Sequence, residues 1–337
     1  MRAFRIEAPG RSSVVDVPPP RAEPGSVVVD VARVGLCGTD AEFLSGEMAY
    51  LHEGRAHYPL RIGHEWAGTV TELGAGVDPA WLGRRVTGDT MIGCGVCPRC
   101  RAGRHNVCAN RLEIGIRGGY PGALAEQLAV PAGALLALPD SVDDVAGALV
   151  EPGGNSVRAV DAAGVEPGER LLVLGAGSIG LLIALIARTR GVRVQLVGRS
   201  ARSLDFAASL GFADAGPIES IPDVAWDGAI DASTASTGPG LLLDLVEPGR
   251  RVVCIGLAET PSAVDSRTLV LKDVTAVGIL SGSAGLGGAI ELYASGAVDP
   301  RPLVAATVGL EEAGRVLAGN RPAGAGLGPK FQVDPRH

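Results

Sequence analysis

Four cysteines fall within fifteen residues and could hold a metal ion: Cys94, Cys97, Cys100 and Cys108. Zinc in structural sites takes four ligands in a tetrahedron, and thiolates at short spacings on one loop can wrap around it. An all-cysteine set leaves no open coordination position. The spacing therefore predicts a structural zinc lobe over about residues 90–110. His105 lies inside this loop and is expected to be a surface residue.

A second set of potential metal ligands is spread over the first half of the chain. Cys37 precedes a Gly-Thr-Asp segment, His64 and Glu65 are adjacent, and Glu151 precedes a proline. A cysteine, a histidine and a carboxylate are suitable ligands for a catalytic zinc that keeps one position open for substrate or water. Each residue also has an ordinary explanation as a small core cysteine, a buried hydrogen-bonding histidine or an acid at a helix start. The spacing alone leaves both interpretations open.

The segment from Gly175 to Gly180 matches the dinucleotide-binding pattern G-x-G-x-x-G. It follows an apolar run, 170–174, and opens an apolar run, 179–190, which predicts the strand–loop–helix context that the pattern requires. The first glycine makes the tight turn, the second lets the backbone approach a pyrophosphate, and the third lets the helix pack closely on the strand. The helix N-terminus favours the negative charge. The residues expected to bind a dinucleotide are Gly175, Gly177, Ser178, Ile179 and Gly180.

The end of the next predicted strand indicates which dinucleotide binds. An NAD site carries Asp or Glu there, bonded to the ribose 2′-hydroxyl. This chain has Gly198, Arg199 and Ser200 at that place, with Arg202 just beyond. Arg199 and Ser200 could hold a 2′-phosphate through charge-assisted hydrogen bonds, although a solvated arginine after a strand is also common. We expect NADP, with NAD as the less favoured cofactor.

The elements that must position these residues change character along the chain. Residues 1–150 contain short β-like runs, such as 26–32 and 68–73, broken by glycine and proline. From 151 to 285 strands alternate with helices, which predicts a doubly wound parallel sheet. The last segment, 286–337, contains a helical run and a short closing strand. The expected fold class is α/β, with a β-rich domain and a Rossmann domain.

Length and composition limit the number of domains and the kinds of partner. At roughly 150 residues per domain, the 337 residues suggest two domains. The net charge of −7 and the aromatic content of 4% argue against a nucleic-acid partner. The start of the chain lacks the apolar stretch of a signal peptide, and no apolar run is long enough to cross a membrane. We therefore expect a cytoplasmic protein with reduced cysteines and no membrane partner.

The motifs occur in the order seen in one known family. The Cys37-Gly-Thr-Asp segment, the Gly-His64-Glu65 segment, the four-cysteine lobe and the Rossmann unit resemble the zinc-dependent medium-chain dehydrogenases/reductases over essentially the whole chain. Glu151-Pro-Gly-Gly-Asn155 resembles the polyol, sugar and threonine dehydrogenase branches, whereas classical alcohol dehydrogenases have a cysteine ligand in this region. The resemblance implies a GroES-like catalytic domain closed by the C-terminal segment, a Rossmann domain, and a homodimer or homotetramer.

The resemblance also implies roles for the metal-site residues. Cys37 and His64 are the secure ligands of the catalytic zinc. Glu65 and Glu151 compete for the remaining place, and the resemblance implies that they can exchange as the metal moves. Asp40 lies behind the ligands, accepting from His64 or otherwise fixing a ligand.

A proton path is implied as well, with one departure from the family. Thr39 passes the substrate hydroxyl proton toward the cofactor ribose. A histidine often completes that relay a few residues after the cysteine, but here Ala and Glu42 follow the Thr-Asp pair. Glu42 resembles the glucose dehydrogenase-like members, in which an acidic residue can contact the substrate. His52 and His57 are alternative proton acceptors or plain loop residues.

The implied reaction is hydride transfer between an alcohol and the nicotinamide, with zinc acting as a Lewis acid, or the reverse reduction of a ketone or aldehyde. The polar residues Glu42, Glu65, Glu151 and Asn155 favour a polyol, sugar or cyclitol, because a hydrophobic alcohol would leave them unpaired. One alternative is a zinc enzyme that acts on a simple or amino-acid-derived alcohol, with NAD as an alternative cofactor. The others are a zinc-free reductase of quinones or enoyl groups and a non-catalytic NADP-binding protein.

Overall fold

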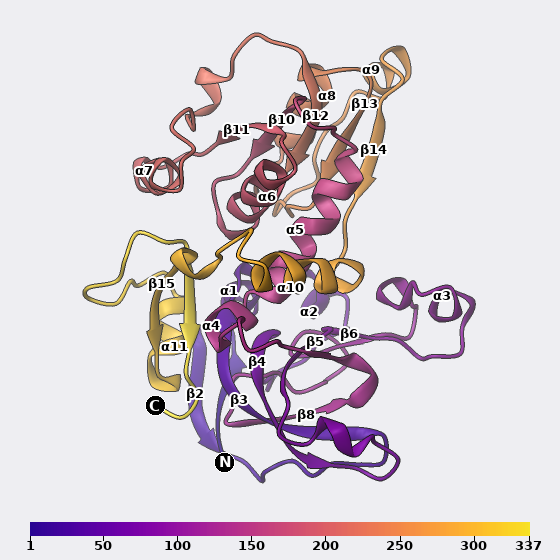
Figure 1. Ribbon diagram of the computed structural model, residues 1–337. Helices are drawn as coiled ribbons and strands as arrows, with labels where there is room; N and C mark the ends of the chain where they lie inside the picture. The colour runs from indigo at the N-terminus through magenta and orange to yellow at the C-terminus, as the bar shows by residue number, and fades with distance from the viewer. The chain divides into compact units, whose positions relative to one another are not determined.

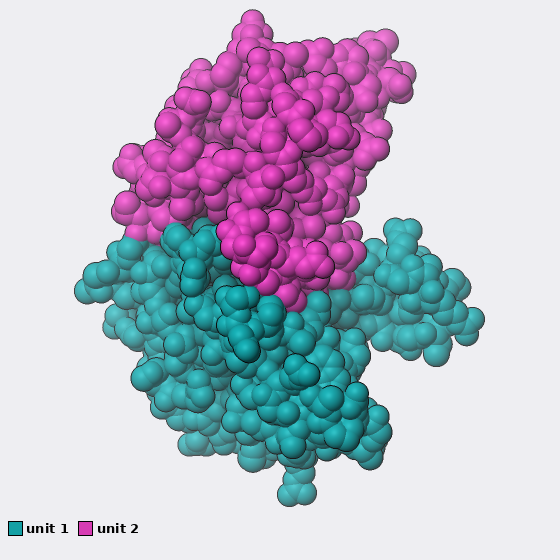
Figure 2. All heavy atoms as spheres, in the orientation of Figure 1, with its two compact units in different colours: residues 1–151, 299–326, 330–337 teal, residues 152–298, 327–329 magenta.

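The computed structural model describes residues 1–337 and divides into two compact units. Unit 1 comprises residues 1–151, 299–326 and 330–337, and unit 2 comprises residues 152–298 and 327–329 (Figure 2). The chain thus leaves unit 1 after residue 151, returns to it at residue 299, and belongs to unit 2 once more only over residues 327–329. Residues 299–326 and 330–337 form one compact unit with the N-terminal part of the chain.

Unit 1 is built on a seven-stranded sheet with strand order β15-β16-β3-β4-β5-β9, in which β8 also pairs with β3. Two small sheets, β1-β2 and β6-β7, accompany it (Figure 1). Its strands are β1 (Arg2–Ala8), β2 (Arg11–Asp16), β3 (Ser26–Leu36), β4 (Glu65–Leu73), β5 (Arg85–Gly88), β6 (Met91–Ile92), β7 (Leu112–Glu113), β8 (Gln127–Pro131), β9 (Leu135–Ala137), β15 (Val304–Val308) and β16 (Lys330–Val333). Its helices are α1 (Gly38–Ser45), α2 (Ala49–His52), α3 (Pro98–Arg101), α4 (Asp144–Gly147) and α11 (Leu310–Leu317), with 3₁₀ turns at Pro79–Trp81, His105–Val107, Ala132–Ala134 and Arg301–Leu303.

Strand β3 positions the metal-ligating residues of unit 1. It is rich in valine, which favours strands, and most of its residues are buried. Other strands pair with it on both sides, so it is a central strand of the sheet. It runs antiparallel to β4, with Gly35 opposite Glu65. Cys37 follows the end of β3, and His64 precedes the start of β4. Antiparallel pairing therefore places Cys37 and His64 at the same edge of the sheet.

Unit 2 is a parallel sheet of five strands in the order β11-β10-β12-β13-β14. In chain order this is 2-1-3-4-5, one of the common doubly wound arrangements, and it confirms the predicted sheet. Helices α5 and α6 lie in front of the sheet in Figure 1. The strands are β10 (Arg170–Leu174), β11 (Arg193–Val197), β12 (Trp226–Asp231), β13 (Val246–Cys254) and β14 (Thr275–Gly278). The helices are α5 (Val150–Ala163), which begins at the boundary, α6 (Ser178–Thr189), α7 (Ala201–Ser209), α8 (Gly238–Leu245), α9 (Ser266–Leu271) and α10 (Leu286–Ala294), with 3₁₀ turns at Ile218–Ser220 and Ser283–Gly285.

The second domain boundary differs from the prediction. We expected residues from 286 onward to belong with the first domain, but unit 2 extends to Val298. The reason is that α10 packs directly on α5: a Cβ added at Gly153 would lie 3.0 Å from the Cβ of Ala289 and 2.3 Å from the hydroxyl of Tyr293. Glycine lets the two helices approach closely, and this contact cannot be read from local sequence.

The long apolar helix α6 of unit 2 does not approach membrane length. It has 12 residues, eight of them buried. No helix of the chain combines the length and the apolar character that crossing a bilayer requires.

Candidate active site

Cys37, His64 and Glu65 bring their potential ligand atoms within 4.8 Å of one another. Cys37 is half-buried at the N-cap of α1, while His64 and Glu65 are buried. A thiolate, an imidazole and a carboxylate are the donors of catalytic zinc sites. The donor set and its compactness therefore fit a zinc ion. Three of the four sequence-predicted ligands are brought together here.

Asp40 lies behind this group and contacts two of its members. Its Oδ2 accepts a hydrogen bond from the backbone N–H of Cys37 at 2.9 Å, and its Oδ1 lies 3.5 Å from Nδ1 of His64. Both Oδ1 and Nδ1 are buried and have no other hydrogen-bond partner. Burial opposes charge on the imidazole, but Asp40 and Cys37 together raise the pKa of His64 well above its ordinary value. A carboxylate behind Nδ1 orients the ring and favours Nε2 as the metal ligand.

Lys330 is a site residue that sequence reasoning missed. Its Nζ donates to both carboxylate oxygens of Glu65, at 2.7 and 2.8 Å, and to the carbonyl of Leu36 at 3.1 Å. The side chains of Lys330 and Glu65 are only 4% and 1% exposed. Although burial opposes charge on the ammonium, the charge and hydrogen bonds of Glu65 raise the pKa of Lys330, which favours the charged ammonium. One signal was available, because Lys330 is one of only two lysines in the chain and stands in the short closing strand beside Phe331.

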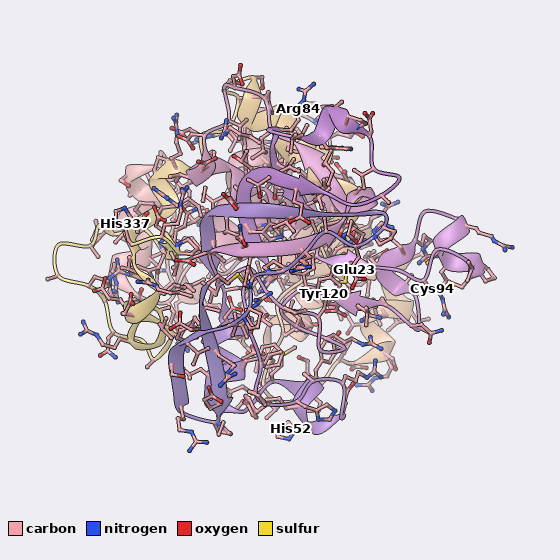
Figure 3. All side chains as sticks on the ribbon, turned by 90° about the horizontal axis from the view of Figure 1, so that it is seen from below. Glu23, His52, Arg84, Cys94, Tyr120 and His337 are labelled. Carbon is pink, nitrogen blue, oxygen red and sulfur yellow. The ribbon has the colours of Figure 1, made fainter.

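The remaining predicted residues of unit 1 take different places. Thr39 and Glu42 are half-buried on α1, the helix that Cys37 caps. Glu151 is half-buried at the start of α5 and is not part of the group of mutually close ligand atoms. His52 and His57 are exposed, and Figure 3 shows His52 at the outer edge of its view.

The four-cysteine lobe has the geometry of a structural zinc site. Its sulfur atoms all lie within 4.8 Å of one another, and Sγ of Cys97 lies 3.8 Å from Sγ of Cys108. Tetrahedral zinc with Zn–S bonds of about 2.3 Å requires sulfur separations of about 3.8 Å. Backbone N–H groups lower the pKa of Cys94 to about 6, which favours its thiolate. Figure 2 shows the lobe projecting from the rest of unit 1, and Figure 3 places Cys94 on it.

The expectation for His105 requires a correction. This residue is half-buried rather than a plain surface residue, because its Nε2 lies 2.7 Å from Oδ2 of Asp89. A Cβ added at Gly93 would lie 2.7 Å from both Sγ of Cys100 and the Cβ of His105. His105 therefore connects the lobe to the main body of unit 1.

The glycine-rich loop of unit 2 has the form that a dinucleotide requires. Gly175 adopts φ +104°, a conformation that other residues rarely adopt. A Cβ at Gly180 would lie 1.7 Å from the carbonyl oxygen of Gly175, so the third glycine permits the close approach of helix and loop. A Cβ at Gly177 would meet nothing within 4 Å. Gly177 thus exposes its backbone at the N-terminus of α6, which begins with Ser178 and Ile179, where a pyrophosphate can approach.

The residues expected to choose the cofactor lie at the end of β11. Gly198 directly follows this strand, and Ser200 caps α7, its Oγ accepting a backbone N–H of the first turn. Arg199 and Arg202 are exposed and form no ion pair within the chain. Two arginines without partners and no carboxylate therefore stand at the position that contacts the adenine ribose in this fold.

Comparison with known proteins gives matches to sequence and structure. The model of the alcohol dehydrogenase GroES-like domain matches residues 23–140. L-threonine 3-dehydrogenase of Rhizobium etli (strain CIAT 652) is 30% identical over 276 residues, 78% of each chain. The 2-dehydro-3-deoxy-L-galactonate 5-dehydrogenase of Pseudoalteromonas atlantica is 32% identical over 306 residues, 87% of each chain.

Solved structures match nearly the whole chain. A zinc-binding dehydrogenase of Sinorhizobium meliloti 1021, bound to NADP, has a TM-score of 0.88 and 30% identity over 99% of both chains. An alcohol dehydrogenase of Escherichia coli CFT073, complexed with NADH, has a TM-score of 0.90 and 24% identity over 99% of both chains. The GroES-like and Rossmann domains expected from the sequence are thereby confirmed.

Proposed function

Because the chain belongs to the zinc-containing medium-chain dehydrogenase/reductase superfamily, we propose that it oxidises a secondary hydroxyl of a polyol, sugar or cyclitol with NADP. It is a zinc-dependent NAD(P) dehydrogenase of the alcohol and polyol type. The observation that supports NADP is the pair of unpartnered arginines, Arg199 and Arg202, beside Gly198. The NADP-bound zinc-binding dehydrogenase among the similar structures agrees with this choice.

Each site residue of the chain then has a separate role in the proposed reaction. Cys37 and His64 hold the metal, Glu65 or Glu151 completes the set, and Asp40 keeps His64 oriented. Bound zinc supplies Lewis acidity, which lowers the pKa of a substrate hydroxyl. The hydroxyl of Thr39 would accept the proton that leaves the substrate and pass its own proton toward the cofactor ribose, and a bound nicotinamide would supply the acceptor for the carbon-bound hydrogen.

The proposed substrate class is supported by polar residues of unit 1 that the family resemblance assigns to the site. Thr39 and Glu42 lie on α1, which Cys37 caps, and these two residues and Glu151 are half-buried. Carboxylate and hydroxyl groups favour a substrate with several hydroxyls, since such a substrate can donate hydrogen bonds to them and an apolar alcohol chain cannot. The relative named for a deoxygalactonate substrate supports this proposal.

A second candidate is an amino-acid-derived alcohol, with NAD as an alternative cofactor. It is supported by the similarity to L-threonine 3-dehydrogenase. The test is the initial rate of reduced-cofactor formation with NADP and with NAD, on a panel of polyols, sugars, cyclitols, simple alcohols and L-threonine. Turnover of a polyhydroxylated member with NADP supports the proposal. Turnover confined to L-threonine contradicts it and supports the second candidate.

The cofactor assignment has its own test at Gly198. Gly198→Asp should lower the NADP-to-NAD ratio of kcat/KM, because a carboxylate repels the 2′-phosphate and accepts the ribose hydroxyl. One charge-assisted hydrogen bond contributes about 1.5–3 kcal/mol, which is roughly 10- to 150-fold. A Cβ at residue 198 would lie 2.9 Å from both the Cβ of Ala176 and Cδ2 of Leu204, so Gly198→Ala is the necessary steric control. Equal ratios in the two variants would contradict the assignment.

The metal assignment is tested at Cys37. Cys37→Ser should abolish turnover and remove the zinc of this site while the chain remains folded, because the residue lies at a helix cap outside the hydrophobic core. Circular dichroism and zinc analysis provide the controls. Wild-type turnover after full loss of that zinc would refute the mechanism.

The homo-oligomer expected from the family is likewise a proposal. Strand β14 is an edge of the unit 2 sheet and is largely exposed, and the neighbouring Val270 and Leu271 are 77% and 85% exposed. An exposed apolar edge favours pairing with a second copy. Light scattering on the purified protein should give the mass of a dimer or tetramer, and the mass of a single chain would contradict the proposal.

A further inference from the structure

A buried ammonium binds the same carboxylate that the metal would use. The three N–H donors of Lys330 are all occupied, two by the oxygens of Glu65 and one by the carbonyl of Leu36. Each Glu65 oxygen accepts one of these hydrogen bonds and keeps a further lone pair, since a carboxylate offers about four acceptor sites. The Glu65 oxygen that lies within 4.8 Å of Cys37 and His64 can therefore face a metal and Lys330 together.

The backbone around Glu65 is shaped for this arrangement. Gly35 is on β3, where it lies opposite Glu65 of β4 on one side and opposite Gln332 of β16 on the other. A Cβ at Gly35 would lie 2.1 Å from Oε2 of Glu65, so a larger residue would displace the carboxylate. Strand β16 in turn delivers Lys330 beside the end of β3. Three strands thus hold the carboxylate between the ammonium and the ligand residues.

We propose that Lys330 is a positioning residue that keeps Glu65 an exchangeable ligand of the zinc. The inference rests on the proposed zinc site at Cys37 and His64. With the ammonium present, one carboxylate charge is shared by two cations, which weakens its donation to the metal. Without Lys330, zinc would be the only countercharge of a carboxylate that is 1% exposed, so Glu65 would stay bound. With Cys37, His64 and Glu151 as the other ligands, a permanently bound Glu65 would be a fourth protein ligand and would close the position that a catalytic zinc leaves open.

The experiment uses cobalt(II) in place of zinc, because its visible absorption reports the coordination number. Cys37→Ser, which retains only the four-cysteine site, supplies the spectrum to subtract. Lys330→Met should change the difference spectrum and slow the release of cobalt to a chelator on the order of tenfold, the usual size of such outer-shell effects. Lys330→Gln, which keeps an N–H donor for Leu36, is measured in parallel in case the methionine variant does not fold.

The effect must act through Glu65. In a Glu65→Gln background, replacing Lys330 should leave both the spectrum and the release rate unchanged. If folded Lys330 variants match the wild type, or if their effect persists in the Glu65→Gln background, the inference is wrong while the zinc site stands. If Cys37→Ser binds as much cobalt as the wild type, the proposed zinc site fails and the inference fails with it.

Discussion

The buried pair between Lys330 and Glu65 predicts strongly non-additive effects on stability. Neither side chain is more than 4% exposed, so solvent does not screen the charges. Removing one member of a buried ion pair leaves the other charge uncompensated and costs about 3–5 kcal/mol. Lys330→Met and Glu65→Met should therefore each lower the free energy of unfolding of unit 1 by that amount.

The double substitution should restore most of the loss. Replacing both charges with apolar side chains is often neutral or stabilising. Here the carbonyl of Leu36 also loses its Lys330 donor, at a cost of about 1–3 kcal/mol when it is left unpaired. The double variant should then lie within about 3 kcal/mol of the parent, which implies a coupling energy of several kcal/mol between the two sites.

The assay is urea unfolding followed by tryptophan fluorescence. Two background substitutions make the assay specific. Cys37→Ser removes the metal that would otherwise compensate the charge of Glu65. Trp226→Phe leaves only Trp66 and Trp81 as fluorophores, both in unit 1. The signal then reports the unfolding of unit 1 alone. The reasoning is refuted if the destabilisation in the double variant equals the sum of the two single effects within about 0.5 kcal/mol. The two residues would then contribute to stability independently of one another.

Further predictions concern the lobe and unit 2. Cys97→Ser should release the structural zinc and make the lobe susceptible to trypsin, because the fold of the lobe depends on the metal. The control is Val96→Ser, at a residue 68% exposed, which should change neither the zinc content nor the cleavage by trypsin. Gly177→Ala should preserve the melting temperature, since its Cβ would meet nothing within the chain, but the added methyl should weaken cofactor binding in a fluorescence titration. Gly180→Ala should lower the melting temperature, since its Cβ would lie 1.7 Å from a backbone oxygen of the loop. Burial raises the pKa of Asp231, so the folded chain holds this proton more tightly than the unfolded chain. Its stabilisation is complete below the ordinary carboxyl pKa and is lost as the pH rises through the raised pKa, and Asp231→Asn should flatten that part of the curve of unfolding free energy against pH.

Motifs that are short in sequence could be recognised without a structure. The four cysteines lie on one loop, and the glycines from Gly175 to Gly180 join one strand to one helix. In both cases the chemistry depends on the spacing within a single segment, and local geometry follows from that spacing. The alternation of strands and helices in unit 2 was predicted for the same reason, since each element carries its own hydrophobic period.

Contacts between distant segments could not be predicted in this way. The sequence places a helix at about 287–295, but its packing on Gly153 and hence its membership of unit 2 depend on two elements more than a hundred residues apart. His105 was expected on the surface because its partner Asp89 lies outside the cysteine loop. In each case a side-chain environment was assigned without knowing which segment packs against it.

The sequence by itself determined the two domain types, the structural zinc lobe, the dinucleotide loop and the candidate ligands Cys37, His64 and Glu65. Only the tertiary structure decided that Glu65 is held by Lys330, which stands 265 residues away along the chain. The physical reason is the pairing of β16 with β3, which brings a C-terminal strand beside the metal residues. Local spacing specifies which groups can bind a metal, whereas strand pairing across the chain specifies which charges surround them.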